Sequence, residues 1–328
     1  MKIAEFDQIL SNRKDERIVT RLGDMTIADD ASVLQLGSDV FAMDDAVERN
    51  LASYLKIPSS YLAACPPDFK ATTLQFWQRE HADAETVMEL TDGHIVAIHS
   101  PDNLMIPMRE VVRVAERVFD PEAEIRYHYM DENRLHLDVT TPQHAVDVQS
   151  PVYRQVGDIT QAGLRFLAYP NQTKAPSVGA YMERLVCTNG MTTTERAGAI
   201  SLQGRTVEEV IDEMEAAARR MMGTLDDRLA RYASTAQQPI PGNRQAFAHQ
   251  LAREANLTRS VLDAVMELVN QLPDNATLYD MNQAFTSVAN TDVNYATRTR
   301  LQTLGGYMAF EPDRIVARCT TCQHPLDI

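Results

Sequence analysis

The sequence predicts an α+β fold, with a β-rich middle over about residues 86–202, an N-terminal helical segment before it and a C-terminal α-helical region after it. In the middle, short apolar runs with strand-like alternation are separated by turn residues. After Gly204, apolar residues recur at the spacing of a helix. Such segregation of strands from helices is typical of α+β folds, whereas regular alternation of strands and helices along the chain predicts a parallel sheet. With 328 residues, the chain exceeds the usual size of a single core, so we expect one compact body with two lobes, or two domains.

The N-terminal domain, residues 1–84, is predicted to contain strands and then helices. Short apolar runs over residues 17–41 indicate strands. Asp44 is the expected N-cap of a helix that ends before Pro58. The apolar face of this helix comprises Val47, Leu51, Tyr54 and Leu55.

A second helix is expected near Ser59, and this order of helix, turn and helix also occurs in DNA-binding helix-turn-helix proteins. The second helix offers Ser59 and Tyr61 but no Lys or Arg between Lys56 and its end. Packing of the two helices against each other is therefore the better interpretation. A third helix is expected from Pro66–Pro67, and it contains the only tryptophan, Trp77.

The central domain, residues 85–205, reads as strand, strand, helix, strand, strand and then further strands. The first four strands are TVMEL, HIVAIHS, EIRYHYM and RLHLDVT, with a helix from Pro107 to Phe119. Further on, the segments VGDITQAGLRFLAYP, VGAYMERLVCTNG and AISLQG remain β-rich. Asn189–Gly190 predicts a tight turn because both residues tolerate positive φ. Cys187 is then expected to be a small buried thiol rather than a nucleophile, because no histidine and orienting group can be assigned to it.

The helical domain, residues 206–310, begins with a predicted capping box made by Thr206 and Glu209. The apolar stripe that follows continues to Leu229 and indicates a long amphipathic helix. Four further helices are expected over residues 243–255, 258–271, 277–289 and 294–309. Residues 311–328 form a tail that contains two of the four cysteines.

The composition favours a cytoplasmic protein that does not enter a membrane. No run of about 18 apolar residues is present, and the first residues carry no secretory signal. Four cysteines are too few for a disulfide scaffold, so we expect reduced thiols. The net charge of −15 would repel polyanions at long range. Residues 140–205 nevertheless hold six basic and four acidic residues, which makes this window relatively basic.

The sequence motifs do not indicate an enzyme. There is no P-loop, no G-x-S-x-G, no H-E-x-x-H and no dinucleotide-binding fingerprint. Asp138, His144 and Asp147 could meet on a sheet and serve a metal-dependent nuclease, but their spacing does not define a set. His128 and His136 on neighbouring strands could also approach each other, although no carboxylate completes a metal site at known spacing.

The tail is the strongest candidate for a metal site. Cys319 and Cys322 have the spacing that lets two thiolates bind one Zn²⁺, and His324 adds a nitrogen. A structural zinc site needs a fourth ligand, for which Cys187, a water or another subunit remain open. The alternative is a pair of reduced, exposed thiols.

The stretch GDITQAGLRFLAYPNQTKAPSVGAYMERLVCTNGM resembles the phage/plasmid-like protein family, the domain-of-unknown-function family numbered 932. The matching positions are Gly157, Asp158, Gly163, Arg184, Val186, Cys187 and Asn189. The segments IPSSYLAACP, HIVAIHS and LYDMNQAFTSVANT also resemble the family, so the likeness covers about residues 42–310. The loop YPNQTKAPSVG departs from the family pattern, and the cysteine-containing tail looks like an addition.

The resemblance implies a phage- or plasmid-encoded accessory protein of DNA metabolism, and single-stranded DNA binding or annealing is its concrete form. The expected phosphate contacts are Arg154, Arg165, Lys174, Arg184 and Arg196, and the expected base-stacking residues are Tyr169 and Tyr181. The alternative is a protein-interaction module, such as an inhibitor of a host system, which would bind a host or phage protein. We also expect a homo-oligomer.

Overall fold

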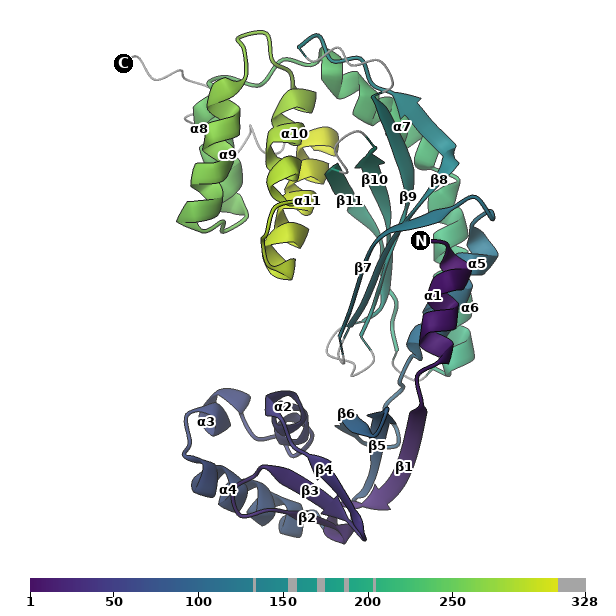
Figure 1. The fold of residues 1–328 in the computed structure, drawn as a ribbon, viewed down its shortest axis with the longest axis vertical. Coiled ribbons are helices and arrows are strands. Elements are labelled where there is room, and N and C mark those ends of the chain that lie inside the picture. The colour runs from purple at the N-terminus through teal and green to yellow at the C-terminus, as the bar shows by residue number, and fades with distance from the viewer. Residues whose placement is uncertain (132–133, 153–157, 170–174, 186–188, 203–204, 312–328) are drawn as a thin grey trace.

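The computed structural model describes residues 1–131, 134–152, 158–169, 175–185, 189–202 and 205–311. These residues form three antiparallel sheets with helices packed around them, which confirms the predicted α+β fold (Figure 1). The buried apolar side chains fall into three clusters. One belongs to a small lobe near the N-terminus, one to the central sheet and its helices, and one to the C-terminal helices. Among the described residues, none of the helices combines the length and the hydrophobicity of a membrane-spanning segment.

The small lobe contains two three-stranded sheets and three helices. One sheet has the order β1-β5-β6, and the other has the order β2-β3-β4. The strands are β1 (Asp15–Arg21), β2 (Met25–Ile27), β3 (Val33–Leu36), β4 (Asp39–Ala42), β5 (Glu85–Thr91) and β6 (His94–His99). The helices are α2 (Asp45–Tyr54), α3 (Ser59–Ala63) and α4 (Pro67–Glu80). Asp44 caps α2 as predicted, because its carboxylate accepts hydrogen bonds from the backbone N–H groups of Ala46 and Val47.

The small lobe extends beyond the domain boundary that was predicted between residues 84 and 85. β5 pairs with β1 over its whole length, from Asp15 opposite Thr91 to Arg21 opposite Glu85. β5 and β6 therefore share a core with the N-terminal strands and helices rather than with the rest of the β-rich middle. Conversely, helix α1 (Ile3–Ser11), which the sequence analysis did not predict, packs in the core of the central body.

The central body is built on a five-stranded antiparallel sheet of consecutive hairpins, in the order β11-β10-β9-β8-β7. Its strands are β7 (Glu124–Asp131), β8 (Arg134–Asp147), β9 (Ile159–Ala168), β10 (Ser177–Arg184) and β11 (Asn189–Ala199). One face packs against α1, α5 (Met108–Val118), α6 (Val207–Met222) and α7 (Leu225–Ser234) (Figure 1). Leu135, Leu137 and Val139 of β8 point to this face and are fully buried, so the residues between them point to the other face.

Two local features of the sheet involve residues that the sequence analysis named. Asn189 and Gly190 do not form a turn, because they pair with Arg184 and Glu183 at the start of β11. Gly163 of β9 faces an irregular stretch of β8, and a Cβ atom there would lie 1.9 Å from the carbonyl oxygen of Val139. Only glycine allows the two backbones this close approach.

The helical region follows the predicted order. Thr206 and Glu209 form the predicted capping box of α6. The predicted long helix is interrupted at Gly223, after which α7 begins. The remaining helices are α8 (Arg244–Glu254), α9 (Arg259–Gln271), α10 (Leu278–Val288) and α11 (Tyr295–Phe310). α11 contacts β11 and α10, so these helices lie beside the sheet on the side opposite α6 and α7 (Figure 1).

Candidate functional site

The sheet face opposite α6 carries charged side chains that are fully buried. Arg165 on β9 donates from Nε and Nη2 to the two carboxylate oxygens of Asp138 on β8, at 2.6 and 2.7 Å. His136 Nε2 lies 2.9 Å from the same carboxylate, and Arg165 Nη2 also donates to Oε1 of Gln302 on α11 at 2.6 Å. These four residues connect the sheet to the last helix, and water does not reach their charges.

The electrostatics of this network fix its protonation states at neutral pH. Burial raises the pKa of Asp138, but the charge of Arg165 and the hydrogen bonds outweigh burial and lower that pKa to about 2. Burial lowers the pKa of His136 below its ordinary value, despite the neighbouring Asp138. The neutral imidazole then donates from Nε2 to Asp138, and its Nδ1 accepts from the hydroxyl of Tyr295 at 3.0 Å.

A second buried ion pair joins Asp158 and Arg184, two residues of the stretch GDITQAGLRFLAYPNQTKAPSVGAYMERLVCTNGM that the sequence analysis singled out. Arg184, at the end of β10, donates to both carboxylate oxygens of Asp158, beside the start of β9. The hydroxyl of Tyr279 on α10 donates to the same carboxylate at 3.1 Å. The Asp and Arg of that stretch therefore have a structural role, because they attach the central sheet to the C-terminal helices.

These positions correct part of the predicted nucleic-acid interface. Arg165 and Arg184 are paired with carboxylates in the interior, and Tyr181 is only 1% exposed. Their side chains are buried in this structure and do not lie where phosphates or bases would bind, so the interface described below does not include these three residues. The sequence did contain an indication that the two arginines are paired. They lie within apolar strands, and charged residues at core positions of such strands are almost always paired.

The other predicted residues lie in different places. Tyr169 follows β9 and is half-buried at the edge of the site. Arg196 is on β11 opposite Gly179, and its side chain is outside the described residues. Arg154 and Lys174 are also outside them, as are the proposed zinc ligands Cys319, Cys322 and His324.

Beside the buried network, tyrosine rings and arginines form a half-buried group that we call the tyrosine–arginine cluster. Its members are Tyr127 and Tyr129 of β7, Arg134 of β8, Tyr169 after β9, and Tyr295 and Arg298 of α11. The Arg134 guanidinium lies 4.4 Å from the centre of the Tyr295 ring and 5.9 Å from the Tyr129 and Tyr169 rings. The Arg298 guanidinium lies 4.8 Å from the centre of the Tyr127 ring. Guanidinium groups favour such positions over aromatic rings.

The positive charges of this cluster are not neutralised within the part of the chain that the structure describes. Neither Arg134 nor Arg298 forms an ion pair with a carboxylate there, and Nε of Arg134 is buried without a hydrogen-bond partner. The Asp131 carboxylate, on the residue opposite Arg134 in the β7–β8 pairing, accepts a hydrogen bond from the Tyr129 hydroxyl, which raises the pKa of Tyr129. The cluster thus combines aromatic surface with two arginines that form no ion pair among the described residues, in a protein of net charge −15.

The candidate nuclease residues do not form a metal site. Asp138 is bound by Arg165 and His136, whereas His144 Nδ1 lies 2.7 Å from Asp226 on α7. His128 contacts Phe6 on the other face of the sheet from His136. Among the described residues, no three His, Cys, Asp or Glu side chains are grouped so that they could hold a metal ion.

Comparisons with protein-family models, with curated proteins and with solved structures find no match to this chain. The geometry of the tyrosine–arginine cluster therefore carries the functional interpretation.

Proposed function

We propose that the protein binds single-stranded nucleic acid through the tyrosine–arginine cluster, as an accessory protein of phage or plasmid DNA metabolism. The observation that carries this proposal is the Arg134 guanidinium, which three tyrosine rings surround while no described carboxylate pairs with it. Bases of a single strand stack on such rings without regard to sequence, and arginines contact the phosphates between them. A duplex keeps its bases stacked inside, so it cannot use the same rings.

The local positive charge makes this function compatible with an acidic chain. The net charge of −15 repels a polyanion at long range, so binding must come from short-range contacts. Because Arg134 and Arg298 are already oriented by the tyrosine rings, little side-chain entropy is lost when a strand binds. The proposed interface differs from the sequence prediction in its arginines but retains Tyr169.

The test is fluorescence anisotropy with a labelled oligo-dT and with a duplex of the same length. We expect the single strand to bind more tightly than the duplex. We also expect its affinity to fall steeply as salt rises from about 50 to 200 mM, because phosphate contacts release counterions. Equal affinity for both nucleic acids, or no binding at 50 mM salt, would contradict the proposal.

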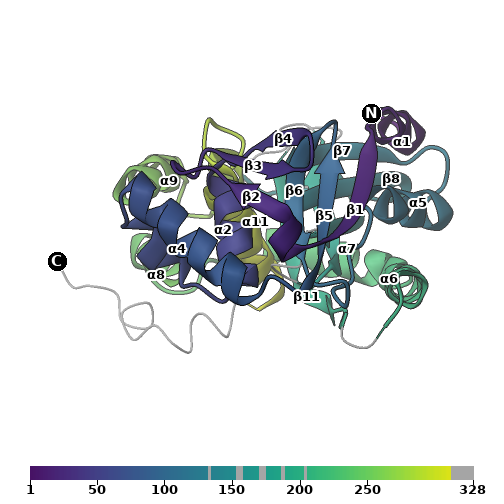
Figure 2. The ribbon, with the colours of Figure 1, turned by 90° about the horizontal axis from the view of Figure 1, so that it is seen from below.

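The second candidate function is protein interaction, with self-association as its simplest form. Four large side chains are exposed on α3 and α4: Tyr61 at 48%, Phe69 at 48%, Phe76 at 50% and Trp77 at 41%. Figures 1 and 2 show α4 on the side of the small lobe that faces away from the five-stranded sheet. Grouped exposed aromatics of this kind mark protein contacts. Sedimentation velocity of the wild type and of a Phe69→Ser/Phe76→Ser/Trp77→Ser variant tests it, and a monomeric wild type at high concentration would contradict self-association.

Zinc in the tail remains part of the proposal for this chain. Cys319, Cys322 and His324 would supply three of its ligands. Elemental analysis of protein purified without chelator is expected to find close to one zinc per chain, and Cys319→Ser should remove it. A metal-free preparation would leave the motif as a pair of thiols.

A further inference from the structure

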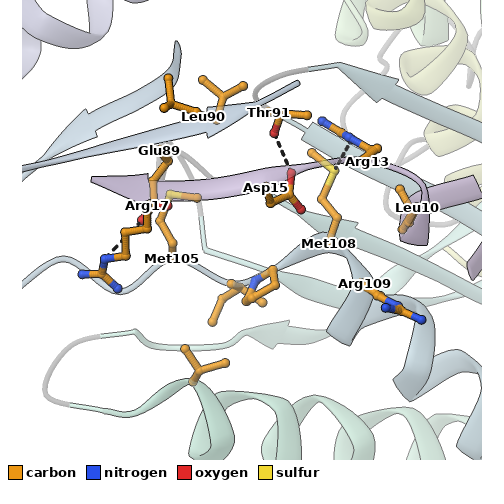
Figure 3. A pocket seen from close by; sticks show the side chains of 14 residues that line it. Leu10, Arg13, Asp15, Arg17, Glu89, Leu90, Thr91, Met105, Met108 and Arg109 are labelled. Atoms are coloured by element: carbon orange, nitrogen blue, oxygen red, sulfur yellow. Dashed lines mark hydrogen bonds and ion pairs between the residues drawn. The ribbon is translucent and has the colours of Figure 1, made fainter. Parts of the chain in front are cut away.

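A pocket of about 270 Å³ lies where the small lobe meets the central body (Figure 3). β1 and β5 of the small lobe form one side, and the end of α1, the segment before α5 and the start of α6 form the other. Its apolar lining consists of Leu10, Leu90, Val96, Met105, Ile106, Pro107, Met108 and Val207. The volume lies just below the usual range for drug-sized ligands, so the pocket suits a smaller molecule.

Three arginines line this pocket, and two of them are already paired. Arg17 lies 3.7 Å from Glu89, and Arg109 makes two hydrogen bonds with Asp7, at 2.8 and 2.9 Å. Arg13 differs, because among the described residues its Nη1 donates to the sulfur atoms of Met130, at 3.0 Å, and Met108, at 3.7 Å. Figure 3 shows the contact with Met108. Thioether sulfur is a weak acceptor. Among the described residues, no carboxylate pairs with the half-buried Arg13 guanidinium, which keeps hydrogen-bonding capacity for an anionic group.

An acidic side chain, that of the exposed Asp15, lines the same pocket. Asp15 accepts one hydrogen bond, from the Thr91 hydroxyl at 2.7 Å, and pairs with no cation of the described residues (Figure 3). Arg13 and Asp15 do not pair with each other either, although both lie at the start of the small lobe and line one pocket. Glu89, the other lining carboxylate, is held by Arg17 and approaches His99 at 3.4 Å.

We propose that this pocket binds a free α-amino acid with an apolar side chain. Its carboxylate would pair with Arg13, its ammonium with Asp15, and its side chain would contact the apolar lining. A simple anion would be repelled by the negative charge of Asp15, and a simple amine would be repelled by the positive charge of Arg13. A zwitterion satisfies both, and charge-assisted hydrogen bonds of this kind are the strong ones. Because the ligand would contact both lobes, its binding also stabilises their junction.

The test uses isothermal titration calorimetry and thermal unfolding of the full chain with three probes, L-leucine, L-methionine and L-phenylalanine. Two analogues of leucine test its two charged groups one at a time. 4-Methylpentanoate lacks the ammonium group, and 3-methylbutylamine lacks the carboxylate. We expect at least one amino acid to bind with a stoichiometry of one and to raise the melting temperature. For leucine, each analogue should bind at least about tenfold more weakly, which corresponds to about 1.4 kcal/mol.

Two variants test whether Arg13 binds the carboxylate of the amino acid and Asp15 its ammonium group. Arg13→Gln and Asp15→Asn should each weaken the binding of the amino acid at least about tenfold, whereas Arg113→Gln, outside the pocket on α5, should leave it unchanged. Circular dichroism confirms that each variant is folded. Failure of all three amino acids to bind at millimolar concentration would overturn the proposal, as would folded Arg13→Gln and Asp15→Asn proteins that bind like the wild type. None of these residues belongs to the tyrosine–arginine cluster, so the outcome is independent of nucleic-acid binding.

Discussion

Arginines of the five-stranded sheet and of α11 occupy two contrasting environments. Arg165 and Arg184 are buried, and each makes two hydrogen bonds with an aspartate. Arg134 and Arg298 are half-buried against tyrosine rings and pair with no carboxylate of the described residues. The first pair holds the C-terminal helices to the sheet, whereas we propose that the second binds a ligand. The residue type alone does not assign the role, because the partner and the exposure decide it.

The largest expected effect comes from breaking a buried pair. Asp138→Ala leaves the Arg165 charge uncompensated in the interior, which should lower the free energy of unfolding by about 3–5 kcal/mol. Urea unfolding followed by circular dichroism measures this loss. The double variant Asp138→Leu/Arg165→Met removes both charges and should recover much of the lost stability. A loss below about 1 kcal/mol for Asp138→Ala would show that the pair is not desolvated as the structure indicates.

The same network predicts a dependence of stability on pH. The pKa of Asp138 is lowered to about 2 in the folded protein, whereas an unfolded aspartate has a pKa of about 3.9. This stabilisation is therefore present above about pH 4 and is lost as the pH falls toward 2. It amounts to about 2–3 kcal/mol. Because the pKa of His136 is also lowered on folding, protonation below about pH 6.5 favours the unfolded state too.

Urea unfolding between pH 3 and 8 measures this dependence. The wild type should lose stability progressively as the pH falls from about 6.5. His136→Gln should remove the part of the decline that begins at about pH 6.5 and keep the part below about pH 4. A wild-type stability that rises on acidification over this range would contradict the assigned protonation states.

A smaller effect is expected when a ring of the tyrosine–arginine cluster is removed. Tyr129→Ala should weaken single-strand binding by about 1–3 kcal/mol, the usual contribution of one stacked base. Tyr129→Phe keeps the ring and should bind nearly as the wild type does. Anisotropy with oligo-dT measures both affinities, and melting temperatures separate binding from folding. Equal affinity of the alanine and phenylalanine variants would exclude stacking on this residue.

Local sequence signals predicted much of the helical region but little of the site. The caps Asp44 and Thr206 are where the pattern placed them, because capping depends on neighbours within one turn. Helix α1 was missed, although Ile3, Phe6 and Leu10 have helical spacing and are buried. The placement of β5 was not predictable from local pattern, because it depends on pairing with β1, which lies about seventy residues earlier.

The candidate site shows the same limit. Arg165 was chosen for its charge within a relatively basic window, but its role is set by Asp138 on the neighbouring strand and Gln302 on α11. Tyr295 and Arg298 belong to a helix that is distant in sequence from β7 and β8, so no spacing rule connects them. Tyr169 was the one residue of the cluster that the β-rich window suggested.

The most direct test of the single-strand proposal is the salt dependence of oligo-dT affinity for matched arginine variants. Arg134→Met/Arg298→Met removes the two stacked charges, and Arg49→Met/Arg220→Met removes two exposed charges elsewhere, on α2 and α6. The first variant should lower the slope of log affinity against log salt by about 1.4, or about 0.7 for each phosphate contact, and the second should leave the slope unchanged. An unchanged slope for the folded Arg134→Met/Arg298→Met protein would contradict the assignment of the cluster as the nucleic-acid interface.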